Sequence, residues 1–110
     1  MNYSFFKTNK YHNEKTKVGN LTFDSKHEAD RWFALRLLER GGIIKNLERQ
    51  VRFEIVPKSE HGRALYYVAD FVYEENGNKV IEDAKGVKTD VYRLKKRLVA
   101  EKYGIVIKET

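Results

Sequence analysis

The sequence predicts an α/β domain, more closely an α+β sandwich, in which two helices flank a mixed four-stranded sheet in the chain order α-β-β-β-α-β. The first observation behind this is the stretch 66–86, where two alternating apolar runs are joined by Asn76-Gly77. Such a pair is a strong signal for a two-residue hairpin turn, because both turn residues must tolerate positive φ. The second observation is that apolar residues recur with helical spacing both before and after this hairpin.

The first predicted helix begins after Ser25 and ends at Gly41-Gly42. Serine followed three residues later by Glu28 matches a capping box, and glycine is common just past a helix end. Apolar residues then recur with helical spacing: Ala29, Trp32, Phe33, Leu35, Leu37 and Leu38. At 100° per residue Glu28 falls inside this apolar arc. We therefore expect its carboxylate to face the body of the protein, a role that competes with capping.

The remaining elements complete the fold. Strands are expected at 20–23, at 51–56 and at 105–107, and a second helix at about 90–103 between Thr89 as N-cap and Gly104. The inner face of this helix is expected to carry Val91, Leu94, Leu98 and Val99. Residues 1–20 are interpreted as a basic N-terminal arm, either mobile or an ordinary terminal extension, and residues 21–110 as a single domain.

Composition excludes several classes of protein. The 110 residues include no cysteine, which excludes disulfides and thiolate metal sites. The three histidines lack zinc-ligand spacing. Because no apolar run approaches the length of a membrane span and the N-terminus lacks an apolar signal region, we expect a cytoplasmic protein without membrane contact. The net charge of +6 favours a polyanionic partner, with nucleic acid first.

The predicted hairpin brings two acids together. A two-residue turn at 76–77 places Asp70 directly opposite Asp83, and directly opposed residues share one face of the sheet. Period-two alternation adds Lys85 to that face. Two facing carboxylates repel each other and are costly to desolvate, and a divalent cation between them would remove that cost. The alternative is a solvated hairpin whose carboxylates pair with Lys85 as a surface salt bridge.

Basic residues concentrate around the second helix: Lys85, Lys88, Arg93, Lys95, Lys96, Arg97 and Lys102. Such a run is commonly the solvated face of an amphipathic helix. It also directly follows the strand that carries Asp83, where a phosphate backbone bound at that site would lie. We therefore treat Lys88, Arg93, Lys95 and Lys96 as candidate nucleic-acid contacts.

The order of elements and acids resembles the core of the PD-(D/E)xK nuclease superfamily over about residues 20–107. The matching residues are Asp70 in VADFVY, Asp83-Ala84-Lys85 in VIEDAKG, and Glu28 in SKHEADRW. Gln50, ahead of the strand 51–56, resembles a glutamine that some branches carry. The chain departs from the pattern where Ala69 replaces a frequent proline and where Asp83 stands in place of the commoner glutamate. The layout is similar to short phage proteins of the superfamily, to Holliday-junction resolvases and to TnsA-type transposon nucleases.

The resemblance implies a restriction-endonuclease-like core and a phage- or prophage-encoded endodeoxyribonuclease acting on branched or replicating DNA in a bacterial host. It implies that Asp70, Asp83 and the Ala84 carbonyl bind Mg²⁺ or Mn²⁺, with Glu28 joining directly or through water. It assigns to Lys85 the orientation of the nucleophile or the neutralisation of charge on the phosphate. Gln50 is counted among the residues that contact DNA, and a homodimer is expected. Glu82 is left out because strand alternation turns it to the opposite face.

Two other functions remain open on the sequence. One is a non-catalytic DNA-binding module on the same scaffold. The other is a small basic protein whose positive face meets an acidic protein partner. An RNA substrate is a further alternative to DNA.

Overall fold

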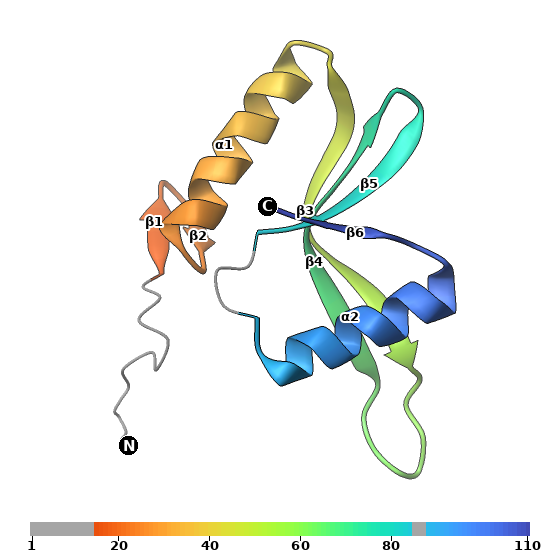
Figure 1. Cartoon of the computed structure of the whole chain (residues 1–110). Coiled ribbons are helices and arrows are strands. Elements are labelled where there is room, and N and C mark those ends of the chain that lie inside the picture. Colours follow the sequence, from red (N-terminus) through yellow and green to blue (C-terminus); the bar gives the residue numbers. More distant parts are fainter. Residues whose placement is uncertain (1–14, 85–87) are drawn as a thin grey trace, which may run out of the picture.

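The computed structural model describes residues 15–84 and 88–110 (Figure 1). Its elements, in chain order, are β1 (Thr16–Val18), β2 (Leu21–Phe23), α1 (Lys26–Arg40), β3 (Ile44–Val56), β4 (Leu65–Glu75), β5 (Asn78–Asp83), α2 (Asp90–Tyr103) and β6 (Ile107–Glu109). The protein is thus α+β, with a mixed four-stranded sheet and a small two-stranded sheet. The predicted order α-β-β-β-α-β is confirmed by α1, β3, β4, β5, α2 and β6. Neither helix in the described part of the chain is long and apolar enough to cross a membrane.

The four-stranded sheet has the order β3-β4-β5-β6. The β3–β4 and β4–β5 pairs are antiparallel, and the β5–β6 pair is parallel because α2 carries the chain back across the sheet. At the β4–β5 turn, Asn76 and Gly77 have φ of 54° and 78°, as a type I′ turn requires. The register runs from Glu75↔Asn78 to Phe71↔Glu82, which confirms the predicted hairpin.

Three segments differ from the sequence prediction. β6 spans Ile107–Glu109 rather than 105–107, and Val106 is 88% exposed, because only Ile107 of the apolar run is buried in the core.

β3 begins at Ile44 rather than at residue 51 and pairs with β4 from there. Its first part is irregular, with a register shift between Lys45 and Glu48 and a positive φ at Asn46. The regular alternation by which a strand is recognised in sequence is therefore interrupted before residue 51. β1 falls within residues 1–20, the segment assigned to an arm, and pairs antiparallel with β2. The rest of that segment, 1–14, lies outside the described residues.

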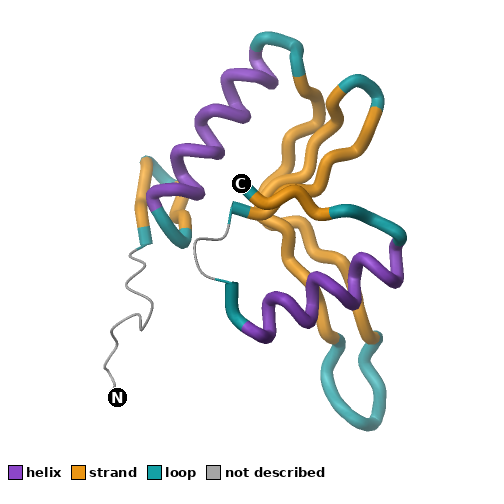
Figure 2. Tube along the Cα trace, in the orientation of Figure 1, coloured by secondary structure: helices purple, strands orange, loops and turns teal. Residues whose placement is uncertain are grey.

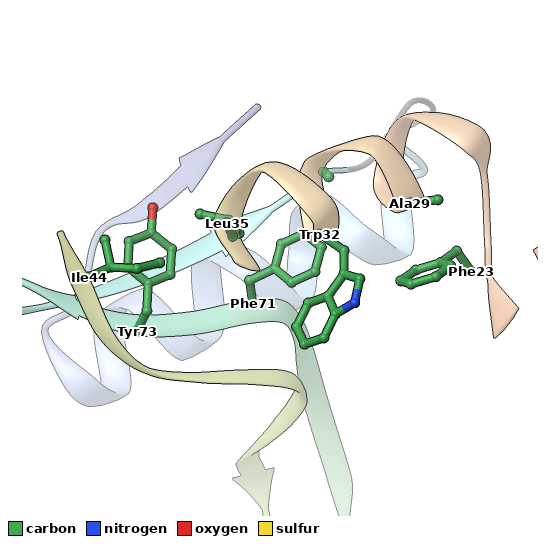
Figure 3. Close-up of a cluster of buried hydrophobic side chains, with 8 residues drawn as sticks. Phe23, Ala29, Trp32, Leu35, Ile44, Phe71 and Tyr73 are labelled. Carbon is green, nitrogen blue, oxygen red and sulfur yellow. The ribbon is translucent and has the colours of Figure 1, made fainter. Parts of the chain in front are cut away.

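Helix α1 covers one part of the sheet through the first of two apolar clusters (Figure 3). The indole of Trp32 stacks on Phe71 of β4, with ring centroids 6.0 Å apart and planes inclined by 18°. The other members of this cluster are Phe23, Ala29, Leu35, Ile44, Tyr73 and Ala84. The predicted caps hold, since Ser25 Oγ accepts the Glu28 N–H at 3.1 Å and Gly41 caps the C-terminus. Phe33 and Leu37, expected in the apolar arc, are exposed.

Helix α2 covers another part of the sheet through the second cluster, which comprises Ile55, Tyr67, Ala69, Val72, Ile81, Tyr92, Val99 and Ile107. Thr89 Oγ1 accepts the Tyr92 N–H at 3.1 Å, and Gly104 ends the helix with φ of 65°. The predicted inner face is wrong for Val91, Leu94 and Leu98, which are exposed. Tyr92 and Val99, two turns apart, form the buried face instead, and packing of the Tyr92 ring on Tyr67 sets this rotation of the helix.

Strand β4 changes face near its middle. Tyr67 and Ala69 pack in the α2 cluster, whereas Phe71 and Tyr73 pack in the α1 cluster. In a regular strand these alternate residues would all share one face. The change therefore occurs between Ala69 and Phe71, that is, at Asp70.

The neighbouring strand is irregular at the same level. Gln50 lies between the pairs Arg49↔Phe71 and Val51↔Ala69, so it faces the level of Asp70, and its φ of 54° is left-handed. The long β3–β4 hairpin thus passes from the α1 half of the molecule to the α2 half at this level (Figure 2). Side chains at this level can reach both helices, which strict alternation would not allow.

Candidate functional site

Two buried carboxylates meet where β4 changes face. Glu28 comes from the first turn of α1 and is 2% exposed, and Asp70 comes from β4 and is 3% exposed. The amide Nε2 of Gln50 donates to Glu28 Oε2 at 3.1 Å and to Asp70 Oδ1 at 3.3 Å. One amide group therefore joins carboxylates from a helix and a strand that are far apart in the chain.

The two oxygens of Glu28 have different partners. Oε1 accepts the backbone N–H of Asp24 at 2.9 Å, while Oε2 accepts from Gln50. The capping role and the inward role expected to compete are thus divided between the two oxygens. Burial raises the pKa of the Glu28 carboxyl, and the negative charge of Asp70 raises it further. The second cause, the charge of Asp70, is one that would attract a cation to this place.

Asp83 is the last residue of β5 and is fully buried. Its Oδ2 accepts a hydrogen bond from the hydroxyl of Tyr67. Asp70 reaches the same strand end, because its Oδ2 accepts the backbone N–H of Ala84 at 2.9 Å. The β4–β5 ladder ends at Phe71↔Glu82, so the facing pair of Asp70 and Asp83 expected from the sequence lies one step beyond its last paired residues.

The donor set suits a hard divalent cation. Mg²⁺ commonly binds through one or two carboxylates while keeping several waters, and the Glu28–Asp70 pair offers such ligands. Within residues 15–84 and 88–110 no group of three or more His, Cys, Asp and Glu side chains could hold a metal ion. Gln50 joins Glu28 to Asp70, and one oxygen of Asp83, at the end of the neighbouring strand, accepts from Tyr67. Lys85, expected beside these acids, lies outside the described residues.

Glu82 lies on the other face of β5, as its position in the strand predicts. Arg31 of α1 donates to it through Nε and, at 3.2 Å, through Nη2, and the Tyr73 hydroxyl donates at 2.8 Å. Burial, followed by the hydrogen bond to Glu82, raises the pKa of Tyr73 to about 12. This network ties the strand that carries Asp83 to helix α1.

A basic groove of about 430 Å³ lies beside α2 and is lined by Lys88, Arg93, Lys96, Arg97, Ala100 and Glu109. It contains three of the predicted nucleic-acid contacts but not Lys95, while Gln50 belongs to the carboxylate pair. Lys96 Nζ lies 3.0 Å from Glu109 Oε2. The hydrogen bond from Lys96 lowers the pKa of the Glu109 carboxyl.

The raised pKa of Glu28 gives a pH-dependent stability with a defined sign. A carboxyl whose pKa is higher in the folded state contributes stability fully below its unfolded pKa, near 4.5, and loses it as pH rises through the folded pKa. In metal-free buffer we expect the stability of Glu28→Gln, relative to the wild type, to increase with pH across this window. Urea unfolding of both proteins from about pH 4 to about pH 8 measures the difference. A constant or falling difference would contradict the raised pKa.

The chain belongs to the family described as "Protein of unknown function (DUF1064)", whose model matches residues 8–109. No curated protein and no solved structure matches the chain. The matched range includes every described element from β1 to β6. The family description names no activity.

Proposed function

We propose that this protein is a metal-dependent endodeoxyribonuclease with a restriction-endonuclease-like core. The observation that carries the proposal is the pair of buried carboxylates, Glu28 and Asp70, held by the single amide of Gln50. Asp70 of the pair also accepts the backbone N–H of Ala84, directly after the end of β5. A stable core gains nothing from two neighbouring buried acids, since each raises the cost of ionising the other. A bound cation would offset this repulsion.

Glu28 and Asp70 are the proposed ligands of Mg²⁺ or Mn²⁺. Asp83 and the Ala84 carbonyl, at the end of β5, would complete the site when the cation is bound. Such a cation, when bound, lowers the pKa of a water and polarises a phosphoryl oxygen. The chain itself does the rest: Gln50 keeps the carboxylates of Glu28 and Asp70 together, and Lys85 neutralises charge developing on the phosphate. Burial of the acids excludes bulk water and strengthens each of these interactions.

The substrate class follows from the groove beside α2. Lys88, Arg93 and Lys96 line it, and each phosphate they neutralise would contribute a slope of about −0.9 to the salt dependence of binding to duplex DNA. Glu109 lines the groove and pairs with Asp83 in the β5–β6 ladder, so a strand bound there would pass the end of β5. We assign branched or replicating DNA as the substrate and a phage- or prophage-infected bacterial cytoplasm as the location, on the resemblance to resolvase-like nucleases.

The proposed enzyme acts as a homodimer, because cutting both strands of a duplex or a junction calls for two sites. The exposed face of α2 offers a contact for a second copy. Val91, Leu94 and Leu98 form one apolar stripe there, with exposures of 62%, 59% and 41%. At 100° per residue Lys95 borders one edge of the stripe and Glu101 the other. Two copies with parallel α2 helices would therefore bring unlike charges together.

The test is an assay of linear, nicked, flapped and four-way-junction DNA with titrated Mg²⁺ or Mn²⁺. We expect cleavage that depends on the metal and stops in chelator, with the junction or flap cut fastest. Light scattering on the same preparation determines whether the chain is a dimer. Absence of cleavage on all four substrates at every metal concentration would contradict the enzyme, and cleavage of an RNA analogue alone would change the substrate.

The two rival functions give different results in the same experiment. A non-catalytic DNA-binding module would bind the junction equally well in chelator and would keep that binding in Asp70→Asn. A small basic protein with an acidic protein partner would release that partner only weakly when duplex DNA is added. Metal-dependent cleavage excludes both as the whole function.

A further inference from the structure

Tyr67 occupies a closed position beside Asp83. The side chain is 2% exposed, and its hydroxyl donates to Oδ2 of Asp83, which is fully buried at the end of β5. Phe53 and Tyr92 pack against the Tyr67 ring, with centroids 6.4 and 6.3 Å away. The ring therefore has a fixed place, and its hydroxyl has a fixed direction.

The residues next to Tyr67, namely Tyr92 and Asp83, are themselves held by hydrogen bonds to the end of the chain. The Tyr92 hydroxyl donates to Glu109 Oε2 at 2.9 Å, and Glu109 pairs with Lys96 of the basic groove. Asp83 pairs with Glu109 in the β5–β6 ladder, and the N–H of Thr110 donates to the Asp83 carbonyl at 2.9 Å. Asp83 is thus held through its side chain by β4 and through its backbone by the end of the chain.

The pKa values of Tyr67 and Tyr92 are both raised by burial and by the nearby Asp83. Burial raises the pKa of Tyr67 far above its usual value, and the hydrogen bond to Asp83 raises it further. Burial also raises the pKa of Tyr92, to which the hydrogen bond to Glu109 and the charge of Asp83 contribute. Tyr67 consequently remains a neutral donor at every physiological pH.

We propose that Tyr67 is a positioning residue that holds the Asp83 carboxylate in the orientation in which it binds the divalent cation. This inference rests on the proposed function, because it takes Asp83 as a metal ligand. Loss of a hydrogen-bond donor that orients a metal ligand without itself binding the metal typically lowers metal affinity about 10–100-fold. Sequence alternation alone would set Tyr67 and Asp70 on opposite faces, so the role depends on the observed path of β4.

The chain supplies a matched control for this residue. Tyr73 is also 2% exposed and also lies on β4, and its hydroxyl donates to a buried carboxylate of β5, that of Glu82. Tyr67→Phe and Tyr73→Phe therefore remove the same atom from equivalent surroundings. Only the first removes it from a proposed metal ligand, so losses of stability should be similar in the two variants and losses of metal affinity should differ.

The experiment is calorimetric titration of the full chain with Mn²⁺ for the wild type and both variants, with circular dichroism and thermal unfolding as checks of the fold. We expect the Kd for Mn²⁺ to rise about 10–100-fold in Tyr67→Phe and to change less than about twofold in Tyr73→Phe. In the cleavage assay, excess Mn²⁺ should restore most of the rate of Tyr67→Phe, because the ligand itself is still present.

The possible outcomes distinguish failure of the Tyr67 role from failure of the proposed nuclease function. Equal Mn²⁺ affinity in Tyr67→Phe and the wild type, or equal losses in the two variants, would overturn the positioning role while leaving the nuclease intact. A wild-type chain that binds no Mn²⁺ would overturn the proposed metal site and this inference together. If Tyr67→Phe should unfold, Tyr67→Met takes its place, because it also lacks the hydroxyl and its flexible side chain can fill the same space. An unchanged Kd there would likewise overturn the role.

Discussion

Asp83→Asn is expected to lower the rate of metal-dependent DNA cleavage by at least about 10³-fold, since loss of a mere outer partner of a metal ligand already costs about 10–100-fold. The substitution removes the charge and keeps the size of a side chain that is fully buried. Asparagine retains an oxygen that can accept from Tyr67, so the fold should survive. Single-turnover cleavage of a labelled four-way junction at saturating Mg²⁺ measures the loss.

Lys85→Ala should also abolish cleavage while leaving junction binding in place.

The control for Asp83→Asn is Asp30→Asn, on the exposed surface of α1. Asp30 pairs with Lys26 at 2.9 Å, and both side chains are largely in solvent. This variant should cleave as the wild type does. Undiminished cleavage by Asp83→Asn would remove Asp83 from the site, and with it the strongest match to the nuclease motif.

Arg31→Met is expected to lower the free energy of unfolding by about 3–5 kcal/mol, the usual cost of leaving one partner of a buried ion pair alone. Arg31 donates to both oxygens of Glu82, which is fully buried and is otherwise bound by the hydroxyl of Tyr73. Without the guanidinium, one donor would remain for a buried negative charge. Urea unfolding at neutral pH measures the change, and cleavage should fall with it because Glu82 adjoins Asp83.

Two further variants show whether charge burial is the cause. Lys26→Met removes an exposed ion pair from the same helix and should cost at most about 0.5 kcal/mol. Arg31→Met combined with Glu82→Gln removes the uncompensated charge yet keeps an acceptor for Tyr73, so it should recover much of the lost stability. A double variant no more stable than Arg31→Met would show that packing of the Arg31 side chain, rather than its charge, is what matters.

Much of the fold was predictable because its signals are local. Asn76-Gly77 is suited to a tight turn by its own backbone preferences, and the register of β4 on β5 follows from that turn. Ser25 and Thr89 cap their helices through their own hydroxyl groups. Each of these features needs only a few consecutive residues, so they can be recognised without knowledge of what packs against them.

The rotation of α2 and the start of β3 were not predictable in this way. Val91, Leu94 and Leu98 form as good an apolar stripe in sequence as the buried pair of Tyr92 and Val99. The choice depends on the fit of the Tyr92 ring against Tyr67 and on its bond to Glu109, three residues from separate elements. No spacing rule contains that information.

Some residues of the candidate site could be recognised from the sequence, and others only from the structure. The sequence pointed to Glu28, Asp70 and Asp83 as candidates through the periodicity of a helix and a hairpin, and all three are buried. It placed Gln50 among DNA contacts, whereas the structure joins Gln50 to Glu28 and Asp70. It also passed over Tyr67, which regular alternation would turn away from Asp70.

The helices and the turn of the central hairpin could be read from the sequence alone, since both follow from residues next to one another. Only the tertiary structure decided that β4 changes face at Asp70. This change directs Asp70 to Gln50 and Glu28 while Tyr67 is left beside Asp83. The physical reason is that the path of a strand under two helices is set by packing of both apolar clusters at once, which no single stretch of sequence specifies.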